Sequence, residues 1–299
     1  MQNQLTTNKK ILALTLMTAI ATVFFSFMGA PFLRVLSASS KRPVFWGLGI
    51  VMVGALIMAQ AQLAAISIGS IWMTLGVYTE FEKRGVEWRK NILLSILAGF
   101  AFVFLLGGFI FKGLSTPLAQ SALQEISAPL LEALQKLFPE NNFVIEMFYP
   151  YLPAVIFTSL MMGLAVGLAF EAQIFRVFQL RRERIASGLR WLDFKLPDLF
   201  VWVSMFGFLF TAVDVGSEMV RVIATNISII AAVAYFIQGI IVYEFMSRLL
   251  RFGLFSKMLM YVCIFLWLAP AVALIGLADF WMDIRTKMTM KTTGKTEKN

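Results

Sequence analysis

NILLSILAGFAFVFLLGGFIF, residues 91–111, is the stretch of sequence that decides the fold of this chain. It contains no Asp, Glu, Lys or Arg. As an α-helix it would be about 31 Å long, which matches the ~30 Å hydrocarbon core of a bilayer. Its apolar residues are continuous and do not alternate with polar ones, as they would in a membrane β-strand. The stretch therefore predicts a helix that lies in lipid.

Other intervals without charged residues extend this pattern along the chain: 11–33, 43–79, 147–170, 199–213, 222–243 and 258–278. The interval 43–79 would form one helix of about 55 Å, which is too long for a single span, so we divide it near Gln60–Gln62. Leu196 and Pro197 extend the short interval 199–213, because proline is tolerated in the first turn of a helix.

The sequence thus predicts an all-α protein, a polytopic bundle with about eight transmembrane helices and seven as the alternative count. We expect a single integral-membrane domain over residues 1–299. The predicted spans lie near 11–33, 44–60, 62–79, 91–111, 150–172, 197–213, 221–244 and 257–278.

The composition agrees with this class and excludes several kinds of chemistry. Hydrophobic residues make up 59% of the chain, charged residues 14%, and the mean hydropathy is +0.79. Histidine is absent and the only cysteine is Cys263, which removes the usual zinc sites and the histidine-dependent nucleophiles. The sequence also lacks the common ATP-binding, serine-hydrolase and zinc-protease motifs. We therefore expect a protein that is not an enzyme and holds no metal or other cofactor.

The basic residues gather in short blocks between the apolar runs, at 34–42, 83–90, 176–195 and 248–257. A net charge of +9 distributed in this way is typical of membrane-protein loops, so we expect no nucleic-acid partner. The positive-inside rule places these loops in the cytoplasm. The polar tail 286–299 is also basic and would lie on the opposite side of an eight-span bundle, which leaves the sidedness of the termini open.

Two segments outside the spans have a pattern of their own. Segment 114–146 carries leucine and isoleucine at helical spacing, which predicts an amphipathic helix that lies flat on the outer membrane face or covers the bundle as a lid. The loop 176–195 mixes arginine with aromatic residues and is expected to bind lipid headgroups or a cytoplasmic partner. The arginines concerned are Arg176, Arg181, Arg182, Arg184 and Arg190.

Small residues four positions apart line single helix faces, which lets two helix backbones approach closely. Such faces serve either for packing inside the bundle or for docking of another membrane subunit. They comprise Ala61, Ala65 and Gly69, then Gly163 and Gly167, and finally Thr18, Thr22 and Ser26.

Polar side chains within the spans are the candidates for a binding site. An amide in hydrocarbon needs a partner and can bind a ligand without the cost of burying a charge. We therefore predict that Gln238, Asn226, Gln60 and Gln62 line a pocket. Asp279 and Asp283 share a helix face and could hold a cation, but local pairing with Arg285 or Lys287 is favoured.

The C-terminal third carries motifs of a known family. They are Leu196-Pro197 at the start of a span, YFIQG at 235–239, and GLADFWMDIRTK at 276–287, in which Gly276, Asp279, Asp283 and Arg285 form the most specific pattern. The chain resembles the YybS family of uncharacterised bacterial membrane proteins. That family is similar to the S-components of energy-coupling-factor transporters, which implies a compact bundle, a bacterial inner-membrane location and a role in transport.

These observations lead to two hypotheses of different kinds. In the first, the protein is a non-enzymatic component of uptake that binds a small molecule or lipid within its bundle. In the second, it is a membrane scaffold that recruits partners through its small-residue faces and the basic loop 176–195. In both cases the expected surroundings are the lipid bilayer, with another membrane subunit or a small-molecule ligand as the partner.

Overall fold

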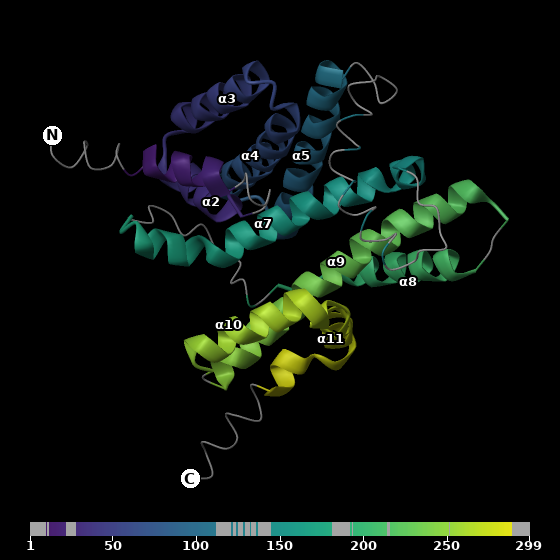
Figure 1. Ribbon diagram of the computed structural model, residues 1–299. Coiled ribbons are helices and arrows are strands. Elements are labelled where there is room, and N and C mark those ends of the chain that lie inside the picture. The colour runs from purple at the N-terminus through teal and green to yellow at the C-terminus, as the bar shows by residue number, and fades with distance from the viewer. Residues whose placement is uncertain are drawn as a thin grey trace, which may run out of the picture. The chain divides into compact units, whose positions relative to one another are not determined.

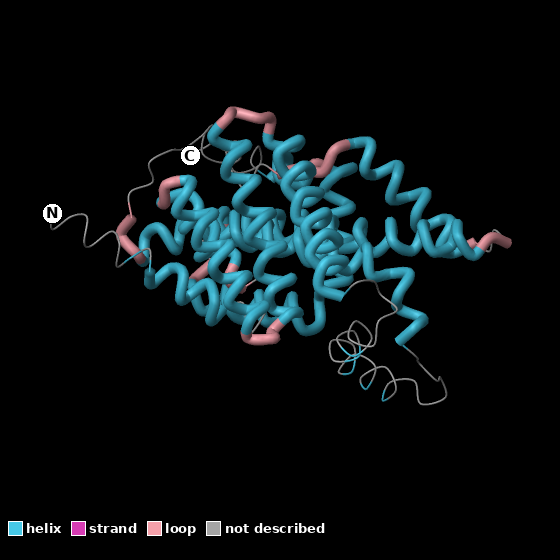
Figure 2. The backbone as a smooth tube through the Cα atoms, turned by 90° about the horizontal axis from the view of Figure 1, so that it is seen from above, coloured by secondary structure: helices cyan, strands magenta, loops and turns pink. Residues whose placement is uncertain are grey.

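The computed structural model describes residues 10, 12–21, 28–111, 121, 124, 128, 132, 136, 145–180, 192, 194–213, 216–250 and 252–288. Every regular element among these residues is helical, and they contain no strand (Figure 2). After a first helix at Leu12–Ala21, the elements are α2 (Ala30–Ser39), α3 (Arg42–Met58), α4 (Gln62–Lys83), α5 (Trp88–Phe111), the 3₁₀ helix η1 (Ile145–Tyr151), α7 (Leu152–Val177), α8 (Asp198–Ala212), α9 (Glu218–Leu249), α10 (Leu254–Cys263), the π-helical η3 (Ile264–Leu268) and α11 (Ala269–Met282).

The helices group into two compact units, Met1–Ser187 and Gly188–Asn299. The first unit contains α2 to α7 and the second contains α8 to α11. Each unit has its own buried residues and is described separately below.

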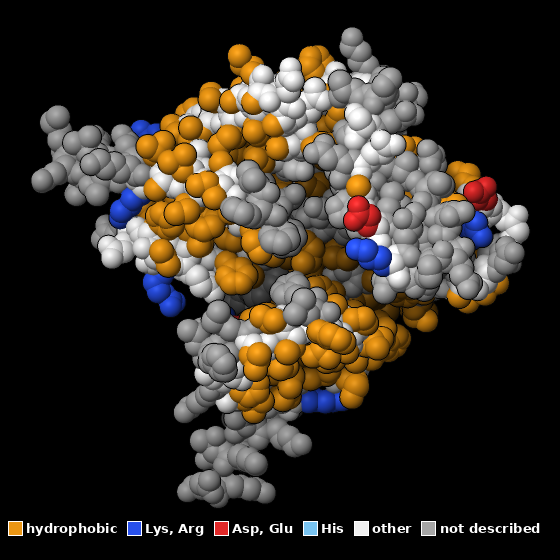
Figure 3. All heavy atoms as spheres, viewed as in Figure 1, with side chains coloured by type: hydrophobic (Ala, Val, Ile, Leu, Met, Phe, Trp, Pro, Cys, Tyr) orange, Lys and Arg blue, Asp and Glu red, His pale blue; other side chains and the backbone are white. Residues whose placement is uncertain are grey.

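Three of the described helices are long and apolar enough to cross a membrane: Trp88–Phe111, Met147–Val177 and Glu218–Leu249. Four shorter apolar helices accompany them, at Leu12–Ala21, Arg42–Met58, Asp198–Ala212 and Ala269–Met282. Large hydrophobic side chains point outward from these helices and cover much of the described surface in Figure 3. On α5, for example, Leu105 is 75% exposed and Phe109 is 80% exposed. Such a surface is stable in lipid rather than in water.

The segment predicted as the first span, 11–33, is not one helix. A turn at Met28–Gly29 separates the helix Leu12–Ala21 from α2, which has Pro31 in its first turn. Proline has no N–H to donate and its fixed φ suits a helix start, so a new helix begins here. With only 10 residues, α2 is too short to cross a bilayer by itself.

Around Gln60–Gln62, where we divided the long apolar interval, the chain reverses between α3 and α4. Gln60 has a φ of 59°, and α4 begins two residues later. In the first unit α4 contacts α2, α3, α5 and α7, and it contributes Ile68, Ile71 and Leu75 to the core (Figure 1). The chain between α5 and η1 lies mostly outside the described residues. Of the predicted amphipathic segment 114–146, the described residues before Ile145 are helical and exposed: Ser121, Gln124, Ala128, Glu132 and Lys136.

In the second unit α9 is the central helix and packs against α8 and α11. Figure 1 shows α8 and α9 side by side. The predicted span 257–278 consists of α10, the π-helical turn η3 and α11. Pro270 lies in the first turn of α11 and cannot donate a hydrogen bond to the turn before it, which explains the irregular helix at this point.

Candidate functional site

Two glycines bring α9 and α11 unusually close together. A Cβ atom added to Gly276 would lie 2.0 Å from the carbonyl oxygen of Tyr235, and one added to Gly239 would lie 1.9 Å from that of Val272. Both distances are far below van der Waals contact, so only glycine is compatible with this helix pair. The close approach places Gln238, next to Gly239, beside Asp279, one turn after Gly276.

Gln238 and Asp279 are both fully buried and form the centre of a polar cluster. Gln238 Nε2 donates a hydrogen bond to Asp279 Oδ2 at 3.3 Å, and Gln238 Oε1 accepts one from the backbone N–H of Leu196 at 3.2 Å. Arg285 donates from Nε and Nη2 to the same Oδ2, at 3.1 and 2.8 Å. Asp279 Oδ1 is buried and has no hydrogen-bond partner among the described residues.

The backbone at Asp283 makes the pairing of Asp279 with Arg285 possible. Asp283 caps α11 in a left-handed conformation with a φ of 45°, and the chain then turns back. Arg285 Nη1 also donates to the carbonyl of Leu192. Asp283 itself forms an ion pair with Lys195. Hydrogen bonds from Lys195 and Thr286 lower the pKa of the Asp283 carboxyl below its usual value. The two aspartates therefore have separate cationic partners.

These contacts join the segment just before α8, the middle of α9 and the end of α11, and they use residues of all three sequence motifs, at 196–197, 235–239 and 276–287. The burial of a charged pair contributes little net stability, but removal of one partner leaves an uncompensated charge. We therefore interpret the cluster as the element that fixes the arrangement of the second unit. Within this cluster, both the oxygen and the nitrogen of the Gln238 amide form hydrogen bonds inside the protein.

A second buried ion cluster lies in the first unit around Arg34, which is only 2% exposed. Arg34 Nη2 lies 2.5 Å from Glu82 Oε2 and 3.5 Å from Glu171 Oε1, and Nη1 donates to Thr79 Oγ1 at 2.7 Å. The guanidinium also stacks over Tyr78, with 5.1 Å to the ring centroid. From the sequence, Arg34 was expected in a basic cytoplasmic loop, but it links α2, α4 and α7.

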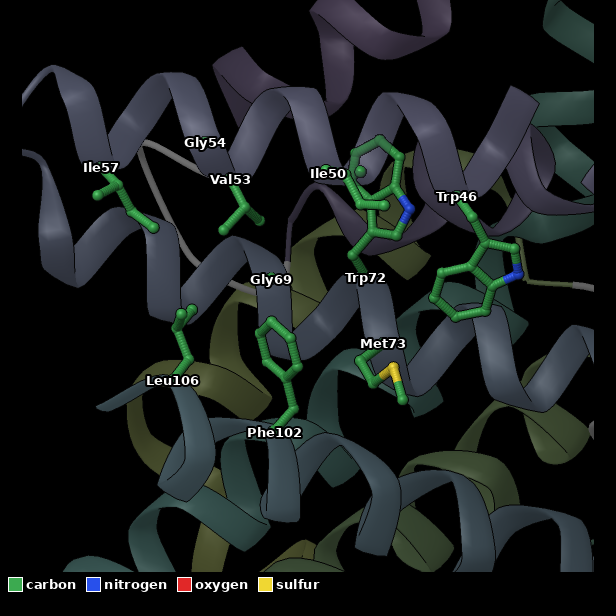
Figure 4. A pocket seen from close by; sticks show the side chains of 11 residues that line it. Trp46, Ile50, Val53, Gly54, Ile57, Gly69, Trp72, Met73, Phe102 and Leu106 are labelled. Atoms are coloured by element: carbon green, nitrogen blue, oxygen red, sulfur yellow. The ribbon is translucent and has the colours of Figure 1, made fainter. Parts of the chain in front are cut away.

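An apolar groove lies among α3, α4 and α5, with a volume of about 330 Å³. In Figure 4, Val53 and Ile57 of α3 and Phe102 and Leu106 of α5 point toward one another across the hollow. Gly49, Gly54 and Gly69 form parts of its wall. A Cβ added to Gly54 would meet no atom within 4 Å, whereas Trp72 lies against Gly49 and Phe102 lies against Gly69. Trp46, Ile50, Trp72 and Met73 complete the lining. Among the residues that the structure describes, no charged or amide side chain lines this groove.

The four amides predicted to line a pocket lie in different surroundings. Gln60 is exposed in the turn between α3 and α4, and Gln62 begins α4. Asn226 is half-buried on α9, and its Nδ2 donates to the carbonyl of Val222 in the same helix. Gln238 belongs to the polar cluster described above. The groove, in contrast, was missed in the sequence, where the glycines of α3 were the only signal that could have indicated it.

The small-residue faces lie mainly against neighbouring helices of the first unit. Gly163 faces Ile71, Gly167 faces Leu75 and the backbone of Ala30, and Gly69 faces Phe102 and Val53. Ala65 is fully buried, Ala61 precedes the first turn of α4, and Thr18 is buried with a hydrogen bond to the carbonyl of Leu14. Thr22 and Ser26 lie outside the described residues.

Most of the basic loop 176–195 lies outside the described residues. Arg176 is exposed in the last turn of α7, whereas Arg181, Arg182, Arg184 and Arg190 lie outside the described residues.

Apolar outer surfaces together with internally paired charges define a helical membrane protein. The chain belongs to the family described as "Predicted membrane protein (DUF2232)", which matches residues 10–280. Neither a curated protein nor a solved structure matches the chain.

Proposed function

We propose that this membrane protein binds the hydrocarbon chain of a lipid-like molecule in the groove among α3, α4 and α5. The observation that carries the proposal is the apolar lining of a hollow on helices that themselves expose hydrophobic side chains. Binding sites for small molecules are typically concave and mostly apolar, and this one offers a chain contacts with three helices at once.

The length of the groove suits a lipid chain. From Trp46 to Ile57 the groove follows α3 for about 16 Å at 1.5 Å per residue. This length is about half of the ~30 Å hydrocarbon core, so the groove is about as long as the acyl chain of a lipid in one leaflet. The amides Gln238, Asn226, Gln60 and Gln62 have no place in this site, so the proposed ligand is held by shape and apolar contact.

The wider role in this proposal is non-enzymatic and related to transport, in a multi-pass protein of the bacterial inner membrane. In this proposal the lipid-like molecule enters and leaves the groove laterally from the bilayer, which suits uptake or transfer. The resemblance to the YybS family and to transporter S-components supports the same role. The alternative of a membrane scaffold would use the small-residue faces and the basic loop 176–195. Of these faces, Gly163, Gly167 and Gly69 already contact neighbouring helices.

Two glycines of α3 provide the experiment. A Cβ added to Gly54 or to Gly47 meets no atom within 4 Å, so both positions accept a larger side chain, but only Gly54 lines the groove. Lipid that co-purifies with the detergent-solubilised protein would be measured by native mass spectrometry for the wild type, Gly54→Phe and Gly47→Phe. We expect Gly54→Phe to lose the bound lipid and Gly47→Phe to keep it. Equal retention by all three proteins would refute the proposal.

A further inference from the structure

We propose that the lipid in this groove carries an anionic headgroup and that Arg42 binds it. The inference rests on the proposed function, because it concerns the polar end of the same ligand. It names the ligand class as an anionic phospholipid.

Arg42 continues the groove-lining face of α3 toward the membrane surface. Residues 42, 46, 49, 53 and 57 follow one another at intervals of three or four, so they share one side of the helix. The last four of them line the groove. Arg42 therefore lies one turn beyond Trp46, where a chain in the groove would reach its headgroup. Tryptophan is enriched at this depth of a membrane.

The guanidinium of Arg42 is available to a ligand. The Arg42 side chain is 62% exposed, and its ion pair with Glu80 of α4 joins Arg42 Nε to Glu80 Oε1 at a long 3.5 Å. A single contact of this length holds the guanidinium only weakly, so a phosphate can compete with Glu80. Arginine suits this role because its planar fork binds a phosphate through two parallel hydrogen bonds.

The charge at this end of the first unit complements an anion. Here α3 begins, α4 ends and α5 begins, and the exposed cations of these three ends are Lys41, Arg42, Lys83, Arg84, Arg89 and Lys90. The acidic residues of the same ends are Glu80, Glu82 and Glu87, and Glu82 is already paired with the buried Arg34. The N-terminus of α3 adds the favourable end of its helix dipole.

The test is a competition between two lipids with identical acyl chains, phosphatidylglycerol, which is anionic, and phosphatidylcholine, which is zwitterionic. Purified full-length protein would be equilibrated with mixed micelles of both in equal amounts and repurified, and the retained lipids would be quantified by mass spectrometry. We expect the wild type to retain several-fold more phosphatidylglycerol. Arg42→Gln should bring the ratio to about one while the total stays unchanged.

Glu80→Gln provides the opposite change. It removes the competing carboxylate and should raise the preference for phosphatidylglycerol, whereas a purely structural role of the ion pair predicts the same effect for both substitutions. Arg221→Gln, which removes an exposed cation at the start of α9 in the second unit, is the matched control and should leave the ratio unchanged.

The outcomes separate this inference from the proposed function. Equal retention of both lipids by the wild type, or an unchanged preference in Arg42→Gln, would overturn the anionic headgroup site while the groove could still bind a chain. Failure to retain either lipid would overturn both proposals. Gly54→Phe should lose both lipids together, because it blocks the chain and not the headgroup.

Discussion

Gln238 on α9 donates a hydrogen bond to Asp279 on α11, and both side chains are fully buried. The amide bridges the backbone of Leu196 and the Asp279 carboxylate, which Arg285 neutralises. Three segments far apart in the sequence are therefore held by one connected set of hydrogen bonds.

Asp279→Ala should lower the free energy of unfolding by about 3–5 kcal/mol, because Arg285 would remain buried without its carboxylate. Thermal unfolding in detergent micelles measures the effect. Asp283→Asn is the control, because asparagine tolerates the left-handed backbone at this position. The side chains of Asp283 and Lys195 are 44% and 40% exposed, so their ion pair contributes at most about 1 kcal/mol. Similar losses in the two variants would contradict the central role of Asp279.

Gly276→Ala should destabilise the second unit, because the new methyl group would collide with the carbonyl oxygen of Tyr235, and overpacking costs about 1–3 kcal/mol or more. The melting temperature of the purified variant is the measurement. Gly253→Ala tests the same substitution in open space and should have little effect. An unchanged melting temperature for Gly276→Ala would show that α9 and α11 are not in direct backbone contact.

Arg34→Met should also cost about 3–5 kcal/mol, because it leaves the carboxylate of the buried Glu171 without this cation. Arg84→Met removes an exposed arginine at the end of α4 and serves as the comparison. Both variants would be compared by resistance to unfolding in detergent. If they unfold alike, Arg34 lies in a hydrated loop, as the sequence alone suggested.

Leu105→Arg tests the solvent around α5. Leu105 is 75% exposed, so the change would be tolerated in water, but an arginine within a lipid-facing helix costs about 2.5–3.5 kcal/mol on membrane-insertion scales. We expect a reduced amount of protein in the membrane fraction of expressing cells. Leu250→Arg, at the end of α9 beside Arg248, should be accepted because its charge can reach the headgroups. Equal insertion of both variants would place α5 in water.

The preference of the groove for an anionic lipid should depend on ionic strength. If Arg42 holds an anionic headgroup, the preference for phosphatidylglycerol should decline as the ionic strength rises, because Arg42 is exposed and exposed charges are screened. Total lipid retained by the groove should change little. The competition experiment repeated at low and high salt gives both quantities, and a preference that is independent of salt would contradict an electrostatic origin.

The helical character of this protein was predictable from the sequence. For example, the uncharged run 91–111 predicted a helix, and α5 covers residues 88–111. The division of the segment 11–33 was not predicted, although Pro31 was visible, because proline is tolerated both at a helix start and inside a membrane helix. The number of about eight spans stays a prediction, since three of the described helices have the length and composition to cross a membrane.

The candidate site was harder to predict. A buried amide needs a partner, so Gln238 stood out, but a distance of 41 residues separates it from Asp279. Which residues meet across helices depends on helix order and rotation, and no local pattern contains that information. The groove among α3, α4 and α5 was not predicted for a related reason, because its volume exists only once these three helices are packed together.

By itself the sequence determined that this protein lies in lipid. Long segments that contain no charged residue move favourably from water into hydrocarbon, and this free energy of transfer adds up along the chain. Only the tertiary structure decided which charges meet, such as Arg34 with Glu82 and Arg285 with Asp279, and where α3, α4 and α5 leave a groove. The physical reason is that pairing and packing are contacts between segments distant in the chain, and they exist only once the helices are placed side by side.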